Sequence, residues 1–173
     1  MPRKPRIIRP GRPHHVTQRG NRRQPVFFGE NDYRFYRQVL AEQCQLAAVS
    51  VWAYCLMPNH IHLLLVPETE SGLTEAVSEA HRRYATFINR RQGWTGHLWQ
   101  DRYASEPIGE DTSLLTVVRY IECNPVEAGL CAKPDDWLWS SARVHVDGAS
   151  DPLLNDSELR AMIPDWKAFL VGT

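Results

Sequence analysis

Hydrophobic and polar positions follow two different periods in the first part of the chain. Segment 14–19 (HHVTQR) alternates with a period of two and stops at Gly20-Asn21, which predicts a strand followed by a turn. A helix is then predicted to begin at Asn31 or Asp32, because either side chain can cap it. Its apolar positions recur at helical spacing: Phe35, Val39, Leu40, Leu46 and Ala47.

Two nearly continuous apolar runs follow this helix, VSVWAYCLM at 49–57 and HIHLLLV at 60–66. The connection between them, Pro58-Asn59, is too short for anything but the turn of an antiparallel hairpin. Runs this apolar indicate central strands that helices cover on at least one face.

The pattern then returns to the helical period. A second helix, capped by Ser71 or Thr74, is predicted to stop at Gly93. Segment 98–108 (LWQDRYASEPI) is typical of a further strand, and Pro107 indicates that this strand lies at an edge of the sheet or ends there.

A third helix is predicted between Asp111 or Thr112 and the stop at Asn124-Pro125. Its apolar stripe consists of Leu114, Val117, Val118 and Ile121. The order strand, helix, strand, strand, helix, strand, helix predicts an α+β fold of the ferredoxin-like, split βαβ type. Helices would pack on a central antiparallel sheet.

With 173 residues the chain is most simply one domain. Segment 133–173 carries three tryptophans and short helical patterns, and we expect it to form a helical or irregular appendage packed on that domain. The longest mostly apolar stretch, 47–57, is too short to cross a bilayer, and prolines replace the apolar region of a secretory signal. We therefore expect a cytoplasmic, nucleoid-associated protein with no membrane contact. The cysteines lack C-x-x-C spacing and should be free thiols.

Charge is segregated along the chain, although 20 Lys and Arg balance 20 Asp and Glu overall. Residues 1–30 hold eight basic side chains and one acid, a net charge of +7, so the rest carries −7. A basic arm at 1–12 is the usual electrostatic footprint of a phosphate-backbone partner. A solubilising tail is the alternative.

His60-Ile61-His62 is the sharpest chemical feature, because side chains alternate along a strand and these two imidazoles share one face. Their Cα atoms would lie about 6.6 Å apart, close enough to converge on one cation. On the third helix, Tyr120 and Asn124 lie four residues apart on one side, and the amide oxygen of Asn124 can ligate a cation. Structural histidines, a packing tyrosine and an asparagine C-cap are the alternatives.

Basic and aromatic side chains that could contact phosphates and unstacked bases are spread over several predicted elements. They are Arg12, Arg19, Arg22, Arg23, Arg82, Arg83, Trp99 and Arg102. Sequence motifs of serine hydrolases, P-loop enzymes, dinucleotide-binding folds and zinc deaminases are absent from the sequence.

Several spaced blocks of this sequence resemble the single-tyrosine transposases that carry an HUH motif (His, hydrophobic, His), specifically those associated with repetitive extragenic palindromes (REP). The blocks are 15–21 (HVTQRGN), 57–65 (MPNHIHLLL), 96–103 (GHLWQDRY), 120–130 (YIECNPVEAGL) and 136–141 (DWLWSS). The resemblance implies an HUH transposase domain at 13–132.

The resemblance implies a metal-dependent nickase and strand transferase that acts on single-stranded, palindromic hairpin DNA. Tyr120 would be the nucleophile and form a 5′-phosphotyrosine link. His60, His62 and Asn124 would hold the divalent metal, Mg²⁺ or Mn²⁺. Tyr84 is a rival nucleophile on another helix, but it lacks an amide four residues further on.

Other functions stay open at this point. The runner-up is a domesticated, non-cleaving DNA-binding regulator on the same fold, and a third possibility is a small structural zinc protein that uses Cys55, His60 and His62. The resemblance further implies a monomer with the tyrosine acting in cis, whereas related insertion-sequence transposases form dimers.

Overall fold

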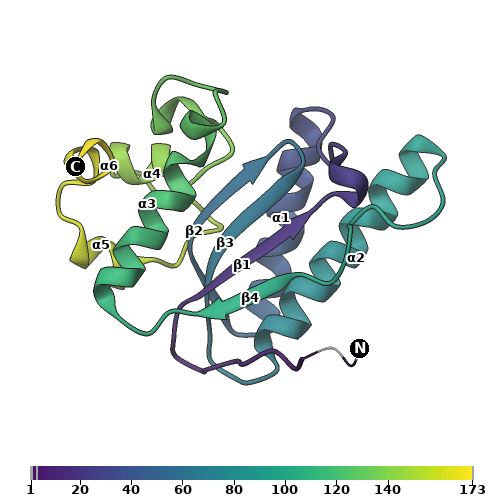
Figure 1. The fold of residues 1–173 in the computed structure, drawn as a ribbon, viewed down its shortest axis with the longest axis horizontal. Coiled ribbons are helices and arrows are strands. Elements are labelled where there is room, and N and C mark those ends of the chain that lie inside the picture. The colour runs from purple at the N-terminus through teal and green to yellow at the C-terminus, as the bar shows by residue number, and fades with distance from the viewer. Residues whose placement is uncertain (1, 3, 173) are drawn as a thin grey trace.

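The computed structural model describes residue 2 and residues 4–172 (Figure 1). Arg3, part of the predicted basic arm, lies outside the described residues. The main elements follow in chain order: β1 (His14–Arg19), η1 (Asn21–Arg23), α1 (Glu30–Leu46), β2 (Val49–Met57), β3 (His60–Pro67), α2 (Gly72–Gln92), β4 (Ala104–Pro107) and α3 (Asp111–Glu127). Four short helices complete the appendage: η2 (Pro134–Asp136), α4 (Ala142–Asp147), α5 (Ser157–Met162) and α6 (Trp166–Val171).

The four strands form one sheet in the order β2-β3-β1-β4, and all neighbours are antiparallel. This is the order of the split βαβ arrangement, since β1 lies between β3 and β4 and β3 lies between β1 and β2. The predicted α+β, ferredoxin-like fold is therefore confirmed.

Helices cover both faces of the sheet (Figure 1). On one face, α1 and α2 pack against inward side chains such as Val16, Ile61 and Leu63. On the other face, α3 and the helices of the appendage pack against Ala53, Cys55 and Leu64. We call these the α1/α2 face and the α3 face. Because neighbouring residues of β3 alternate between two cores, its sequence is apolar almost throughout.

The fourth strand is shorter than predicted. Segment 98–108 forms regular pairing only at Ala104–Pro107, with one isolated bridge between Trp99 and Gly20. Between these points the Gln18 side chain donates a hydrogen bond to the Asp101 carbonyl, at 2.6 Å, in place of backbone pairing. The chain therefore leaves the sheet at 101–103 and returns to it afterwards.

The third helix is longer than predicted, because it continues through Pro125 to Glu127. A proline near the end of a helix removes only one late hydrogen bond, and here the ring is buried. The helix ends where Gly129 adopts a left-handed φ of 73°. Asn124 therefore lies within the helix and is not its C-cap.

The first helix begins at Glu30, and neither predicted capping side chain caps it. Asp32 is instead buried, where it accepts a hydrogen bond from the Phe28 N–H and pairs with Arg91. The four cysteines are free. Within residues 2 and 4–172, no helix combines the length and apolar character that a membrane span needs.

Candidate active site

The two histidines of the HUH motif lie on β3 and face α3. Strand alternation sends Ile61 into the core of the α1/α2 face and leaves His60 and His62 on the α3 face. Their ring centroids are 5.0 Å apart. His62 is buried and His60 is half-buried, so both imidazoles lie at the edge of the α3 core.

A third histidine joins the pair. His15 lies on β1, and its Nε2 is 3.0 Å from Nδ1 of His62. The two rings are stacked, with centroids 5.3 Å apart. The sequence alone does not place His15 in the site, because its contact with His62 depends on the β1/β3 register. The alternation of 14–19 signalled its face, but not its partner.

Asn59 fixes the orientation of His60. Its Nδ2 donates to the Arg23 carbonyl at 3.2 Å, so the other amide atom, 2.7 Å from Nδ1 of His60, is the oxygen. An amide oxygen only accepts hydrogen bonds, so Nδ1 of His60 carries the proton. In the neutral ring the Nε2 lone pair then remains available to a cation. Asn59 was also missed by sequence reasoning.

All three imidazoles of this cluster are neutral at pH 7. Burial lowers the pKa of His62 to about 3, and the neighbouring His60, His15 and Arg19 lower it as well. Burial also lowers the pKa of His15 and that of His60. Neutral imidazole is the form that ligates metal ions, so the site is prepared for a cation without a change of protonation.

Helix α3 brings Tyr120 and Asn124 to the histidines. The Tyr120 ring centroid lies 5.4 Å from that of His62 and 6.0 Å from that of His15. The tyrosine is 45% exposed, so its phenol is accessible from solvent. Asn124, one turn further along, is close enough to His60 to raise its pKa, against the stronger effect of burial. The four predicted residues thus come together from two elements.

Tyr84, the rival tyrosine, is buried in the core of the α1/α2 face. Its hydroxyl donates to the Val26 carbonyl at 2.6 Å. Burial raises its pKa far above the ordinary value for tyrosine. It lies across the sheet from the histidine cluster and cannot serve as the nucleophile there.

The donor set would suit a divalent cation. His60 and His62 could supply imidazole nitrogens and Asn124 an amide oxygen, and phosphate oxygens and water could supply the other ligands. Among the described residues, no three His, Cys, Asp or Glu side chains are placed to hold a metal ion by themselves. Cys55 faces His62 across β2 and β3, but its thiol contacts Met57, and burial raises its pKa well above the ordinary value. The zinc-protein interpretation therefore lacks support.

Three predicted DNA-contacting arginines surround this cluster. Arg19 pairs with His60 across β1 and β3, and Arg22 and Arg23 follow in η1. All three are exposed, and none forms an ion pair with another described residue. Their charges are therefore available to a phosphate backbone. Arg12 and Arg102 are exposed along the β4 edge, where Arg12 contacts the Gly109 carbonyl.

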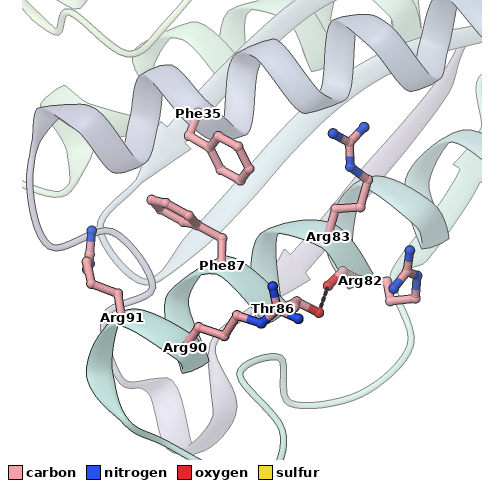
Figure 2. Close-up of a pocket in the computed structure, with 7 residues that line it drawn as sticks. All are labelled: Phe35, Arg82, Arg83, Thr86, Phe87, Arg90 and Arg91. Carbon is pink, nitrogen blue, oxygen red and sulfur yellow. Dashed lines mark hydrogen bonds between the residues drawn. The ribbon is translucent and has the colours of Figure 1, made fainter.

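Arg82 and Arg83 lie elsewhere, beside a pocket between α1 and α2 that also contains Phe35 and Phe87 (Figure 2). Both guanidinium groups are paired, Arg82 with Glu79 at 2.6 Å and Arg83 with Glu42 at 3.0 Å. They therefore belong to the α1/α2 side of the molecule, and their charges are largely balanced.

Trp99, predicted to contact unstacked bases, is buried in this structure and is not an open surface for stacking. It is 9% exposed, its ring stacks on His81 with centroids 4.6 Å apart, and its indole N–H donates to the His81 carbonyl. The bridge to Gly20 pulls this residue inward, against the α1/α2 core.

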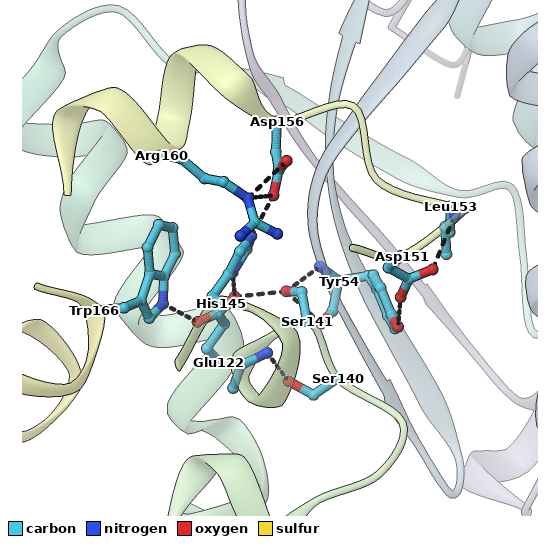
Figure 3. A network of polar contacts seen from close by, with 11 residues as sticks. Tyr54, Glu122, Ser140, Ser141, His145, Asp151, Leu153, Asp156, Arg160 and Trp166 are labelled. Atoms are coloured by element: carbon cyan, nitrogen blue, oxygen red, sulfur yellow. Dashed lines mark hydrogen bonds and ion pairs between the residues drawn. The ribbon is translucent and has the colours of Figure 1, made fainter. Parts of the chain in front are cut away.

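A buried polar network joins α3 to the appendage (Figure 3). Glu122, fully buried between Tyr120 and Asn124 in sequence, contacts the Ser141 hydroxyl, His145 Nδ1 and the Trp166 indole N–H at 2.6–2.7 Å. His145 Nε2 lies 2.6 Å from Asp156. These partners all come from the appendage, so the tyrosine helix is fixed by residues far along the chain.

Three comparisons with known proteins all match transposases. A curated relative from Haemophilus influenzae, named "Putative REP-associated tyrosine transposase", is 26% identical over 116 residues, 61% of this chain and 66% of that protein, just under two thirds of its length. The solved structure of a REP-associated tyrosine transposase bound to a REP hairpin has a TM-score of 0.68 at 21% identity, covering 91% of this chain and 93% of that chain. This likeness shows the fold.

The family described as "Transposase IS200 like" matches residues 12–124. That range is more than half of the chain and contains the three histidines, Tyr120 and Asn124. The chain therefore belongs to the IS200-like transposase family.

Proposed function

We propose that this chain is a nickase and strand transferase that acts on single-stranded DNA beside a palindromic hairpin. The observation that carries the proposal is the approach of Tyr120 to the histidine pair, with ring centroids of Tyr120 and His62 5.4 Å apart. The REP hairpin bound to the structural relative supports hairpin DNA as the partner. The unpaired arginines beside the site support it independently.

In the proposed reaction the phenolic oxygen of Tyr120 attacks the phosphorus of a phosphodiester. The bond from phosphorus to the 3′ oxygen breaks, and that oxygen takes up a proton and leaves as a 3′-hydroxyl. The phenolic proton passes to solvent, which reaches the exposed side chain. The 5′-phosphate stays esterified to Tyr120, and another 3′-hydroxyl can reverse the reaction and join the strand elsewhere.

His60, His62 and Asn124 would hold the divalent cation, Mg²⁺ or Mn²⁺. Such a cation polarises the scissile phosphate, which helps because an ordinary phenol, with a pKa near 10, is a poor nucleophile at pH 7. The chain's own contribution is to keep the imidazoles neutral and oriented. The hydrogen bond from His60 to Asn59 and the contact of His62 with His15 serve that purpose.

The test is formation of a denaturation-resistant adduct with labelled single-stranded palindromic DNA and Mg²⁺ or Mn²⁺. We expect the wild-type chain to form it and Tyr120→Phe to lose it. Tyr84→Phe is the matched control and should retain adduct formation, because Tyr84 is buried on the other side of the sheet. An adduct formed by Tyr120→Phe would refute the assignment of the nucleophile.

A non-cleaving regulator on the same fold would have no use for a nucleophile beside paired histidines. The Tyr120 ring faces His62 and His15, and no described feature favours the regulator.

A further inference from the structure

A second pocket lies next to the candidate active site, between η1 and the loop that follows α2. Asn21 and Arg22 line one side, and Trp94 and His97 line the other. Its volume is about 260 Å³, below the range of about 300–1,000 Å³ that suits drug-sized ligands. A pocket of this size suits a single ring system.

Trp94 is the most exposed tryptophan among the residues that the structure describes. It is 46% exposed, whereas Trp52, Trp99 and Trp166 are each less than 10% exposed. Phe28, itself 43% exposed, contacts the Trp94 ring edge to face, with centroids 5.6 Å apart. Phe28 thus supports the indole, and the exposed part of the ring is a surface on which a planar ring can stack.

The opposite side of the pocket is positively charged. Arg22, with φ of 55°, and Arg23, with φ of 59°, have left-handed backbones that cost free energy in any residue except glycine. The turn persists because the Arg23 N–H donates to the Gly20 carbonyl at 3.0 Å. A Cβ on Gly20 would lie 2.2 Å from the Gln24 carbonyl oxygen, so only glycine permits this tight turn.

Hydrogen bonds join this side of the pocket directly to the histidine cluster. The Gly20 N–H donates to the Asn59 carbonyl, and the Val26 N–H donates to the Pro58 carbonyl, both at 2.8 Å. The Asn59 side chain spans from the Arg23 carbonyl to His60. A nucleotide in the pocket would therefore be a close neighbour of a phosphate held at His60.

We propose that this pocket binds one unpaired nucleotide of the DNA strand, with its base stacked on Trp94 and its phosphate at Arg22. This inference rests on the proposed function. The amide N–H groups of Asn21 and Asn89 are used within the pocket walls, by the carbonyls of His97 and Gly96. Stacking and phosphate charge are then the main contacts, and both tolerate any base.

The test measures binding in a Tyr120→Phe background, so that cleavage does not interfere. The probes are a palindromic hairpin with randomised single-stranded flanks on both sides and the same hairpin with blunt ends. Trp94→Ala should weaken binding of the flanked hairpin roughly tenfold or more, the effect of losing one stacked base. It should leave the blunt hairpin unaffected, and Trp94→Phe should restore most of the affinity.

A second readout locates the nucleotide. With 2-aminopurine placed at successive flank positions, fluorescence should be quenched on binding at one position and should recover in Trp94→Ala. The matched control is Leu46→Ala, which removes an apolar side chain, 81% exposed, at the far end of α1.

Three outcomes separate the two proposals. Equal affinities of Trp94→Ala and its parent for the flanked hairpin overturn the pocket proposal. So does an equal loss on both hairpins, even if the wild-type chain forms the tyrosine adduct. A wild-type chain that forms no adduct and binds neither hairpin overturns the proposed function together with this inference.

Discussion

Asn59 links two parts of the molecule through one amide group. It bonds the Arg23 carbonyl on one side and Nδ1 of His60 on the other. Outer hydrogen bonds of this kind set the tautomer of a ligating histidine, and their loss typically costs about 10- to 100-fold in metal affinity. The residue would therefore act on the proposed cation site without touching the cation.

We predict that Asn59→Ala binds Mn²⁺ about 10- to 100-fold more weakly than the wild-type chain in a calorimetric titration. In the metal-free protein, ¹⁵N chemical shifts should report one His60 tautomer for wild type and a mixture for the variant. Asn155→Ala, which alters an exposed asparagine at Ser50, is the control and should change neither measurement. Unchanged Mn²⁺ affinity in Asn59→Ala would show that Asn59 does not orient the ligand.

At this scale, sequence reasoning found the residues whose evidence is local. The two-residue period of a strand places His60 and His62 on one face, and the helical period places Tyr120 beside Asn124. His15 and Asn59 escaped because their roles depend on register and on a turn. The burial of Trp99 was not evident either, because burial by tertiary packing leaves no local signal.

Helix α3 is joined to the appendage by a buried polar network as well as by apolar contacts. Glu122 is fully buried and contacts three donors from the appendage. Removing one partner of a buried ionic network leaves the other polar groups unpaired, which typically costs about 3–5 kcal/mol. The position of Tyr120 therefore depends on a carboxylate on the opposite side of its helix.

We predict that Glu122→Ala lowers the free energy of unfolding by about 3–5 kcal/mol in chemical denaturation. The control is Glu30→Ala, which breaks an exposed ion pair with Arg34 and should cost less than about 1 kcal/mol. Similar losses in the two variants would contradict a structural role for the network.

The same network predicts a pH dependence. Burial alone would lower the pKa of His145, but hydrogen bonds to Asp156 and Glu122 outweigh it and raise the pKa. A raised pKa means that protonated His145 stabilises the fold below about pH 6.5, and that this stabilisation is lost as the pH rises through the folded-state pKa.

Asp156 sets the lower end of the pH range in which this network stabilises the fold. Burial would raise its pKa, but His145 and Arg160 outweigh this effect and lower it, so its contribution is lost at low pH. We predict that His145→Gln destabilises the chain most at about pH 5–6 and progressively less towards pH 9. Unfolding measured across this range checks it, with His97→Gln, at an exposed site, as control. A difference that grows with pH would have the wrong sign.

The sequence predicted the existence of each long element, and tertiary contacts decided where some of them end. The Gln18 side chain takes the place of backbone pairing at Asp101, so β4 is shorter than the predicted strand at 98–108. Pro125 is buried within α3, so a residue that usually stops a helix lies inside this one. Neither contact can be inferred from a local pattern, because each depends on segments distant in sequence.

Over the whole molecule, a group of three arginines that form no ion pair with a described residue lies at the end of the sheet where β3 begins. Arg19, Arg22 and Arg23 lie there without acidic partners among the described residues, whereas Arg82 and Arg83 are paired with Glu79 and Glu42. The segregation of charge was evident in the sequence. Which arginines remain unpaired was not, because pairing depends on the packing of α1 against α2.

We predict that replacing Arg19, Arg22 and Arg23 together by Gln reduces the slope of log affinity for hairpin DNA against log salt by about 2 to 3. Binding releases the counterions of each phosphate that an arginine contacts, so a variant with fewer such contacts releases fewer counterions and its affinity depends less on salt. Replacing Arg82 and Arg83 by Gln should change the slope by less than about 1, because their carboxylate partners already balance them. Equal slopes for the two variants would contradict this division.

The buried carboxylate of Glu122 limits how far the chain can be truncated from its C-terminal end without loss of contacts to α3. The family match ends at residue 124, yet the donors that satisfy Glu122 are Ser141, His145 and Trp166. A truncated chain that stopped at the end of the match would keep every proposed catalytic side chain and lose the anchors of the helix that carries Tyr120. We therefore expect the minimal working unit of this protein to be larger than the segment by which its family is recognised.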